Sequence, residues 1–67
     1  MTKEEIFKKV NKVDGLGGMT VNERLFVTGL MDSYDNAIIR DKKLARTILE
    51  AIKVDRPSID KIIQENE

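Results

Sequence analysis

Apolar residues recur every three or four positions between residues 20 and 40, the longest such pattern in the chain. Wound as a helix at about 100° per residue, this stretch places most of its polar residues on the opposite side. At its start, Thr20 and Glu23 have the spacing of a capping box, in which each side chain bonds the other residue's backbone amide. The pattern predicts an amphipathic helix over residues 20–39, at the centre of the fold. Its apolar stripe consists of Val27, Leu30, Met31, Tyr34 and Ile38, with Phe26 and Ala37 on one flank.

Some apolar residues of this predicted helix lie off the stripe. Leu25 points almost opposite to Val27, and Gly29 follows one turn later on the same side. A glycine inside a helix costs roughly 1 kcal/mol relative to alanine, so it is best explained if another backbone comes close there. We therefore predict a second, smaller contact on this side of the helix. The interaction patch consists of Leu25, Gly29 and Ile39, with Phe7 and Val10 as neighbours.

The N-terminal segment, residues 3–13, has a similar amphipathic pattern. It follows another capping box at Thr2 and Glu5, which predicts a short helix. A glycine-rich stretch ends this helix, and Gly15 suits the left-handed conformation that closes helices. Glycines before a helix can bind phosphate, but the lysine and hydroxyl residue of a Walker loop are absent here. We interpret the stretch as a linker.

Two more helices are predicted in the C-terminal half. Residues 42–53 follow Asp41, a candidate N-cap, and residues 57–65 begin with Pro57, which a first helical turn accepts. The sequence therefore predicts an all-α fold, a compact cluster of three to four short helices in one domain, 1–67. The predicted core consists of Val27, Leu30, Met31, Tyr34, Ile38, Leu44, Ile48, Leu49, Ile52, Ile59 and Ile62.

One alternative concerns the connection near Asp41. The apolar spacing of four and three continues without interruption from Val27 to Ile52, so a single helix over residues 21–53 would keep its stripe in phase and could form a coiled coil. Asp41 would then occupy a seam position, where a carboxylate is unfavourable. We favour a break at about residues 40–42.

Composition limits the size and the stabilisation of the domain. The chain has 67 residues, no cysteine and no histidine, so disulfides and the common zinc sites are excluded. A core of this size seldom supplies more than about 3–5 kcal/mol. Formation of a homodimer is therefore an expected source of additional buried area.

Charge and hydropathy limit the partners. Basic and acidic residues balance at twelve each, whereas nucleic acids and anionic membranes select for a basic excess. Apolar runs fall far short of the ~20 residues of a membrane helix. The first five residues lack the apolar core of a signal peptide. We expect a cytoplasmic protein with no membrane partner.

No set of residues predicts an enzyme. Asp32 and Asp35 share a helix face and could bind magnesium or act as acid and base, but no other ligand or base converges on them. We interpret them as part of a solvated face, and Tyr34 as a core residue. We expect no enzymatic activity, no cofactor, no metal and no small-molecule substrate.

The predicted helix over residues 42–53 has a basic side. This side suggests an alternative function as a nucleic-acid accessory protein. The helix offers no asparagine, glutamine or aromatic residue for base recognition, and residues 58–65, as a recognition helix, would offer one lysine against two acids. The basic face consists of Lys42, Lys43, Arg46 and Lys53.

Residues 19–32, with the sequence Met-Thr-Val-Asn-Glu-Arg-Leu-Phe-Val-Thr-Gly-Leu-Met-Asp, resemble the opening of a group of short, uncharacterised bacterial proteins. Two further similarities are the steps Tyr34–Asp35 and Val54–Asp55. The resemblance covers residues 19–55 and carries no known activity and no functional residue. It implies that the two helices after Met19 are the common unit and that residues 1–18 are an appended helix and glycine linker.

Taken together, these patterns predict a non-enzymatic protein-interaction module. Apolar residues on both sides of one helix and a chain with few means of stabilising itself favour a protein partner or self-association as a homodimer. The nucleic-acid accessory function is the alternative.

Overall fold

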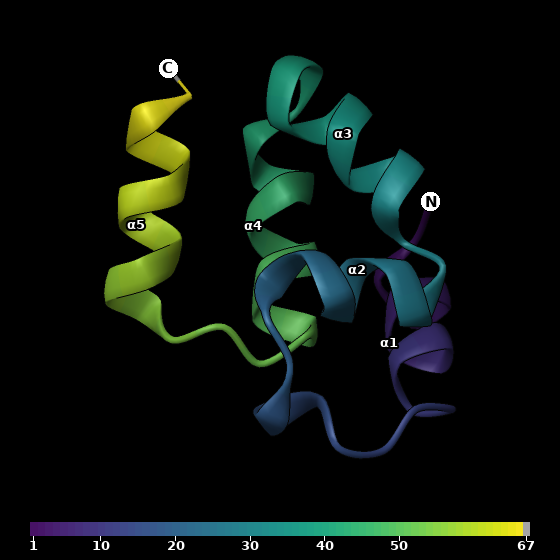
Figure 1. Ribbon diagram of the computed structural model, residues 1–67. Coiled ribbons are helices and arrows are strands. Elements are labelled where there is room, and N and C mark those ends of the chain that lie inside the picture. The colour runs from purple at the N-terminus through teal and green to yellow at the C-terminus, as the bar shows by residue number, and fades with distance from the viewer. Residues whose placement is uncertain (67) are drawn as a thin grey trace.

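The computed structural model describes residues 1–66, and all regular structure in that range is helical (Figure 1). The all-α class is confirmed, with five α-helices instead of the three to four expected. The elements are α1 (Lys3–Val10), the short 3-10 helix η1 (Leu16–Gly18), α2 (Val21–Thr28), α3 (Met31–Arg40), α4 (Lys42–Ala51) and α5 (Arg56–Glu65).

Helix α4 lies at the centre of the fold, in contact with α1, α3 and α5. Figure 1 shows α5 running beside α4 on one side, while the other helices gather on its opposite side. The central position expected for residues 20–39 therefore belongs to α4. Its apolar side chains cover a wide arc of the helix, which allows it to pack against several neighbours at once. Its buried residues are Ala45, Ile48, Leu49 and Ala51.

The predicted helix over residues 20–39 is two helices, because the chain turns at Gly29. Gly29 has a φ of 72°, and its amide donates to the carbonyl of Phe26 over 3.1 Å. The next amide, of Leu30, donates to the carbonyl of Leu25 over 3.0 Å. These two bonds form a Schellman motif, a common helix ending that favours glycine at the left-handed position. Gly29 therefore ends α2, and the prediction that another backbone approaches it is wrong: a Cβ there would meet nothing within 4 Å.

The break at Gly29 changes which side of α2 faces the core. Leu25, predicted to lie on the back of the helix, is 1% exposed and packs in the core. The hydroxyl of Thr28 is also buried and donates to the carbonyls of Arg24 and Leu25. Val27, predicted as a core residue, is 42% exposed, and that prediction is wrong. Its assignment assumed that α2 and α3 share one axis and therefore one apolar stripe.

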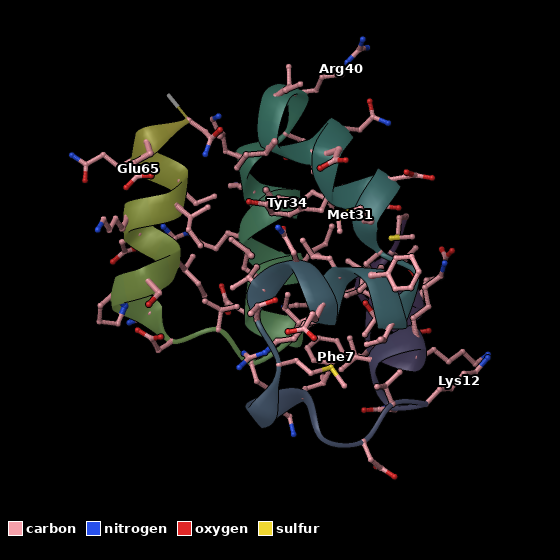
Figure 2. The ribbon with its side chains drawn as sticks, in the orientation of Figure 1. Phe7, Lys12, Met31, Tyr34, Arg40 and Glu65 are labelled. Carbon is pink, nitrogen blue, oxygen red and sulfur yellow. The ribbon has the colours of Figure 1, made fainter. Side chains whose placement is uncertain are left out.

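The rest of the predicted core lies inside or against the core cluster. Tyr34 is half-buried on α3, and Figure 2 shows its ring lying toward α4. The predicted residues that are buried are Leu30, Ile38, Ile48, Leu49, Ile52 and Ile59. Those partly buried against them are Met31, Tyr34, Leu44 and Ile62.

The connection near Asp41 is a break, as predicted. Helix α3 ends at Arg40, and Asp41 has a φ of −149° and a ψ of 84°, which is not a helical conformation. Its carboxylate accepts a hydrogen bond from the amide of Leu44 over 3.2 Å and so caps α4. The alternative of one helix over residues 21–53 is therefore excluded.

The N-terminal segment packs onto the rest of the described chain. Both predicted capping boxes are present, and α1 contacts α4 but ends at Val10, three residues earlier than expected. Gly15 has the predicted left-handed conformation, with a φ of 77°. Leu16 and the two glycines after it form η1, and Leu16 is buried. The residues that this segment adds to the core are Ile6, Val10 and Leu16.

Helix α4 ends with the same motif as α2. The amide of Lys53 donates to the carbonyl of Glu50, and the amide of Val54 donates to that of Leu49. Lys53 occupies the left-handed position with a φ of 68°. The chain then enters α5 through Asp55, whose carboxylate accepts from the amide of Ser58 as an N-cap.

The guanidinium of Arg24, on α2, joins the end of α4 to the loop before α2. Its Nη1 donates to the carbonyls of Ile52 and Lys53 over 3.2 and 3.1 Å, and its Nε donates to the carbonyl of Met19 over 3.0 Å. A cation at the C-terminal end of a helix also interacts favourably with the helix dipole. Arg24 therefore ties three segments of the chain together.

Candidate protein-interaction surface

An apolar groove runs along the outward side of α2 and the start of α3. Phe26 and Val27 are its most exposed apolar residues, at 76% and 42%. Met31 lies in the first turn of α3, beyond the end of α2 (Figure 2). We call this surface the α2 groove. Its lining residues are Met19, Asn22, Glu23, Phe26, Val27 and Met31.

Local sequence signals position the groove. The capping box of Thr20 and Glu23 fixes the start of α2, and the left-handed Gly29 fixes its end. The inner side of α2 carries Val21, Leu25 and Thr28, at spacings of four and three. Phe26 and Val27 lie between Leu25 and Thr28 in the sequence and therefore face outward. The groove is therefore a consequence of where α2 ends.

One edge of the groove is acidic. The amide of Thr20 donates to the carboxylate of Glu23 over 2.9 Å, and this bond, with one from the Thr20 side chain, holds the pKa of Glu23 below its usual range. Hydrogen bonds of this kind stabilise the charged form of a carboxyl. Glu23 therefore carries a negative charge at neutral pH beside Phe26.

The groove can bind apolar side chains but offers no reactive group. Large exposed apolar side chains grouped in one concave place are typical of interaction sites. Methionine side chains such as Met19 and Met31 are flexible and polarisable, and they adapt to partners of different shape.

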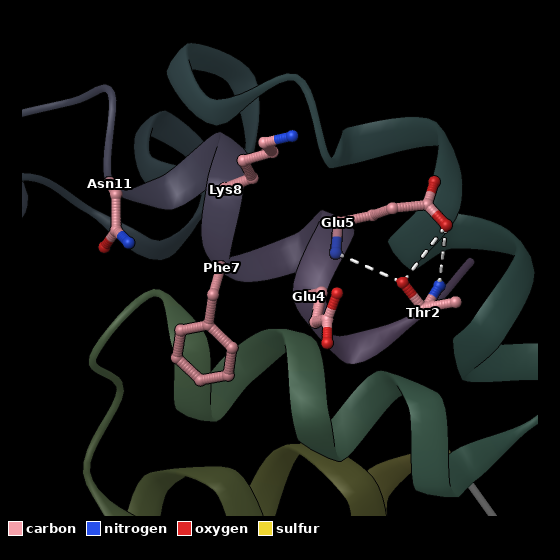
Figure 3. A pocket seen from close by; sticks show the side chains of 6 residues that line it. All are labelled: Thr2, Glu4, Glu5, Phe7, Lys8 and Asn11. Atoms are coloured by element: carbon pink, nitrogen blue, oxygen red, sulfur yellow. Dashed lines mark hydrogen bonds between the residues drawn. The ribbon is translucent and has the colours of Figure 1, made fainter.

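The structure does not gather the predicted interaction patch on one surface. Leu25 and Val10 are buried, so neither can meet a partner. Gly29 is exposed in the turn after α2, and Ile39 is 78% exposed near the end of α3. Phe7 is exposed on α1, where it lines a separate depression (Figure 3). Phe26 and Val27 were missed as surface residues because a continuous helix places them on or beside the core stripe.

The depression on α1 is mainly a capping site. Figure 3 shows the bonds between Thr2 and Glu5, which hold the pKa of the Glu5 carboxyl below its usual range. The side chain of Phe7 points away from this pair. These polar groups satisfy the first turn of α1 and so serve the helix itself.

The structure separates the predicted basic face into residues with different surroundings. Arg46 forms an ion pair with Asp60 of α5, at 2.7 Å, which offsets its charge. Lys42 donates to the carbonyls of Ile38 and Asn66, near the C-terminal ends of α3 and α5. Lys43 is exposed on α4, whereas Lys53 lies beyond its end. These contacts reduce the support for a continuous surface that attracts phosphate.

The described chain, residues 1–66, offers little for metal or acid–base chemistry. Within that range no three metal-ligating side chains come together. Burial and the nearby Asp35 raise the pKa of Tyr34, so its phenol stays protonated at neutral pH. None of the helices in the same range combines the length and the apolar character of a membrane span.

Comparison of the chain with protein-family models, curated proteins and solved structures finds no match. The resemblance of residues 19–55 to short bacterial proteins therefore stays a prediction.

Proposed function

We propose that this chain is a non-enzymatic protein-interaction module that binds its partner through the α2 groove. The observation that carries the proposal is the exposure of Phe26, one of only two phenylalanines in the chain, beside exposed Val27 in a concave surface.

Burial of this surface would contribute a useful binding energy. Fully burying a side chain such as phenylalanine or valine is worth about 1.5–3 kcal/mol. Aromatic side chains in apolar pockets are also frequent hot spots of interfaces. Phe26, at 76% exposed, would gain most from burial, and Val27, which is already partly buried, would add less. Glu23 at the edge would favour partners without a facing negative charge.

The test compares two phenylalanines that differ in location. Phe26→Ser removes the anchor of the groove, whereas Phe7→Ser removes an exposed aromatic side chain on α1. Self-association is measured by sedimentation velocity from micromolar to millimolar concentration, and association with other proteins by co-purification from the source cells. We expect Phe26→Ser to abolish the association and Phe7→Ser to retain it.

Stability is the second measurement. Because Phe26 is mostly exposed, Phe26→Ser should leave the urea midpoint nearly unchanged. If Phe26→Ser and Phe7→Ser behave alike in association, the groove is not the binding surface and the proposal fails.

A further inference from the structure

We propose that the α2 groove is covered by a second copy of this chain, through exchange of the N-terminal halves. In the exchanged dimer, residues 1–28 of each copy occupy the place that they take here, but in the other copy. Helices α2 and α3 then run on as one helix through Gly29. The inference rests on the proposed function, because it names the partner of the same surface.

The turn between α2 and α3 is a suitable hinge. Only Gly29 and Leu30 separate the two helices, and the turn depends on one left-handed residue. Moving Gly29 to helical φ would replace the two Schellman bonds by ordinary helical ones, so the backbone loses no hydrogen bond. Short hinges of this kind are where proteins exchange elements between copies.

The sequence carries an apolar pattern that the turned chain does not use. Val27, Met31, Tyr34 and Ile38 lie at spacings of four, three and four, which align them on one side of a continuous helix. At present Val27 is exposed, while Tyr34 and Ile38 pack inward. Straightening of the hinge would bring Val27 into line with them. The exposed groove and the unused pattern therefore have a common explanation.

The exchanged interface keeps the core contacts of the folded monomer, so what favours the dimer is the release of the left-handed turn at Gly29 and the burial of both grooves. It reuses the contacts that residues 1–28 already make with the rest of the core, including the packing of α1 on α4. Interfaces of obligate homodimers resemble a domain core cut in half. The bonds from Arg24 to the end of α4 would also join the two copies. The core side chains that cross over are Ile6, Val10, Leu16 and Leu25.

The position of the groove fits this arrangement. Phe26 and Val27 lie within three residues of the hinge. The two hinges of a symmetric dimer face each other across the two-fold axis, so these side chains would meet their counterparts there. Each groove would then be covered by the groove of the other copy, so one two-fold contact covers both.

Gly29→Ala tests the hinge directly. A Cβ at Gly29 meets nothing within 4 Å, so the substitution acts through φ alone. Alanine disfavours the left-handed turn and favours a continuous helix, and each effect counts once per chain. We expect dimerisation to tighten by roughly 1,000-fold, measured by sedimentation velocity over a concentration series. Gly29→Asn is the matched control, because asparagine tolerates the left-handed conformation and should shift dimerisation much less.

Isotope-filtered NMR distinguishes exchange from side-by-side contact. A mixture of labelled and unlabelled Gly29→Ala chains is refolded together. The exchanged dimer should give cross-copy contacts between the buried side chains of α1, such as Ile6, and those of α4, because these helices pack together within one copy here. Such contacts support the proposal. A side-by-side dimer gives none, which would overturn the exchange while leaving the groove as the binding surface.

Two other results would also overturn the exchange. One is a Gly29→Ala chain that stays a folded monomer at millimolar concentration. The other is a chain that loses its helical circular dichroism, since the exchanged dimer keeps every core contact. The outcome for Phe26→Ser is independent of both, so failure of the exchange and failure of the α2 groove as a binding surface can be told apart.

Discussion

Helices α2 and α4 end in the same way but with different residues at the decisive position. In each, a left-handed residue is followed by a buried apolar residue whose amide donates to the carbonyl five residues earlier. In α2 the left-handed residue is Gly29, and in α4 it is Lys53. Glycine adopts this conformation without strain, whereas a residue with a Cβ does so at a cost of roughly 1–2 kcal/mol.

The difference indicates what determines these helix ends. Lys53 would not adopt a positive φ unless other contacts required it. Val54 follows it and is buried, and Arg24 binds the carbonyls of Ile52 and Lys53. The end of α4 is therefore held by its surroundings, while the end of α2 is also favoured by its own residue. In both, the need to bury the next apolar side chain sets the turn.

The largest expected effect on stability comes from shortening the buried apolar side chain that follows the left-handed residue. Leu30 is completely buried after Gly29, and Leu30→Ala should lower the free energy of unfolding by about 2–5 kcal/mol. Val54→Ala, the matched change after Lys53, should cost about 1.5 kcal/mol, because it removes less apolar volume. Urea unfolding followed by circular dichroism measures both. A loss below about 0.5 kcal/mol in either variant would contradict the view that burial at this position sets the two turns.

Arg24→Ala should destabilise the end of α4 more than the end of α2. It removes charge-assisted bonds to the end of α4, and each such bond is worth about 1.5–3 kcal/mol, so we expect a loss of at least that size. Arg46→Ala is the control: its ion pair with Asp60 is 38% and 58% exposed and should matter by less than about 1 kcal/mol.

Hydrogen exchange locates the effect of Arg24→Ala. The amide of Val54, bonded to Leu49, should lose protection relative to the amide of Leu30, bonded to Leu25. Uniform loss at both amides would mean that Arg24 acts on the whole fold and not on the end of α4.

The same comparison explains how much of the fold the sequence could predict. The end of α4 was predicted within two residues because Pro57, which is poorly tolerated inside a helix, follows closely and marks the start of the next helix. The end of α2 was missed because no proline follows Gly29 and the apolar spacing continues across it. A lone glycine inside a periodic pattern reads equally as an interior residue or as an ending. The burial of Leu25 decides between them, and that is a tertiary property.

The same error placed the predicted interaction surface on the wrong residues. Phe26 and Val27 lie beside or on the apolar stripe only if α2 and α3 share an axis. Once α2 ends at Gly29, its inner side is set by Leu25, and both residues face outward. The conclusion that an apolar surface of this region is available for contact survives as a proposal, but the residues that would form it change.

Lys53→Gly should reduce the difference between the two helix ends. It removes the strain at the positive φ of 68° but adds flexibility to the unfolded chain. We expect a net gain of about 0.5–1 kcal/mol in the free energy of unfolding, measured by urea denaturation. A loss of stability would instead show that the Lys53 side chain makes a contact of its own that outweighs the strain.

The smallest effect concerns the beginnings of the helices and depends on pH. Hydrogen bonds from Thr20 lower the pKa of Glu23, and those from Ser58 lower that of Asp55, so both carboxyls bind protons more weakly in the folded chain than in the unfolded one. Stability from these caps is therefore complete above the unfolded pKa and is lost as pH falls through the lower folded pKa. We expect the urea midpoint to begin falling below about pH 4.5, the ordinary pKa of a glutamate.

The variant Glu23→Gln measures how much of the decrease in the urea midpoint comes from the cap of α2. Glutamine can still accept the bond from the amide of Thr20, so the cap persists while its titration disappears. The decrease should therefore become shallower than in the unchanged chain, whereas Glu50→Gln, an exposed position in the last turn of α4, should leave it unaltered. Equal slopes for both variants would mean that the first turn of α2 does not depend on the charge of Glu23. The part of the decrease that remains in Glu23→Gln includes the share of Asp55 at the start of α5.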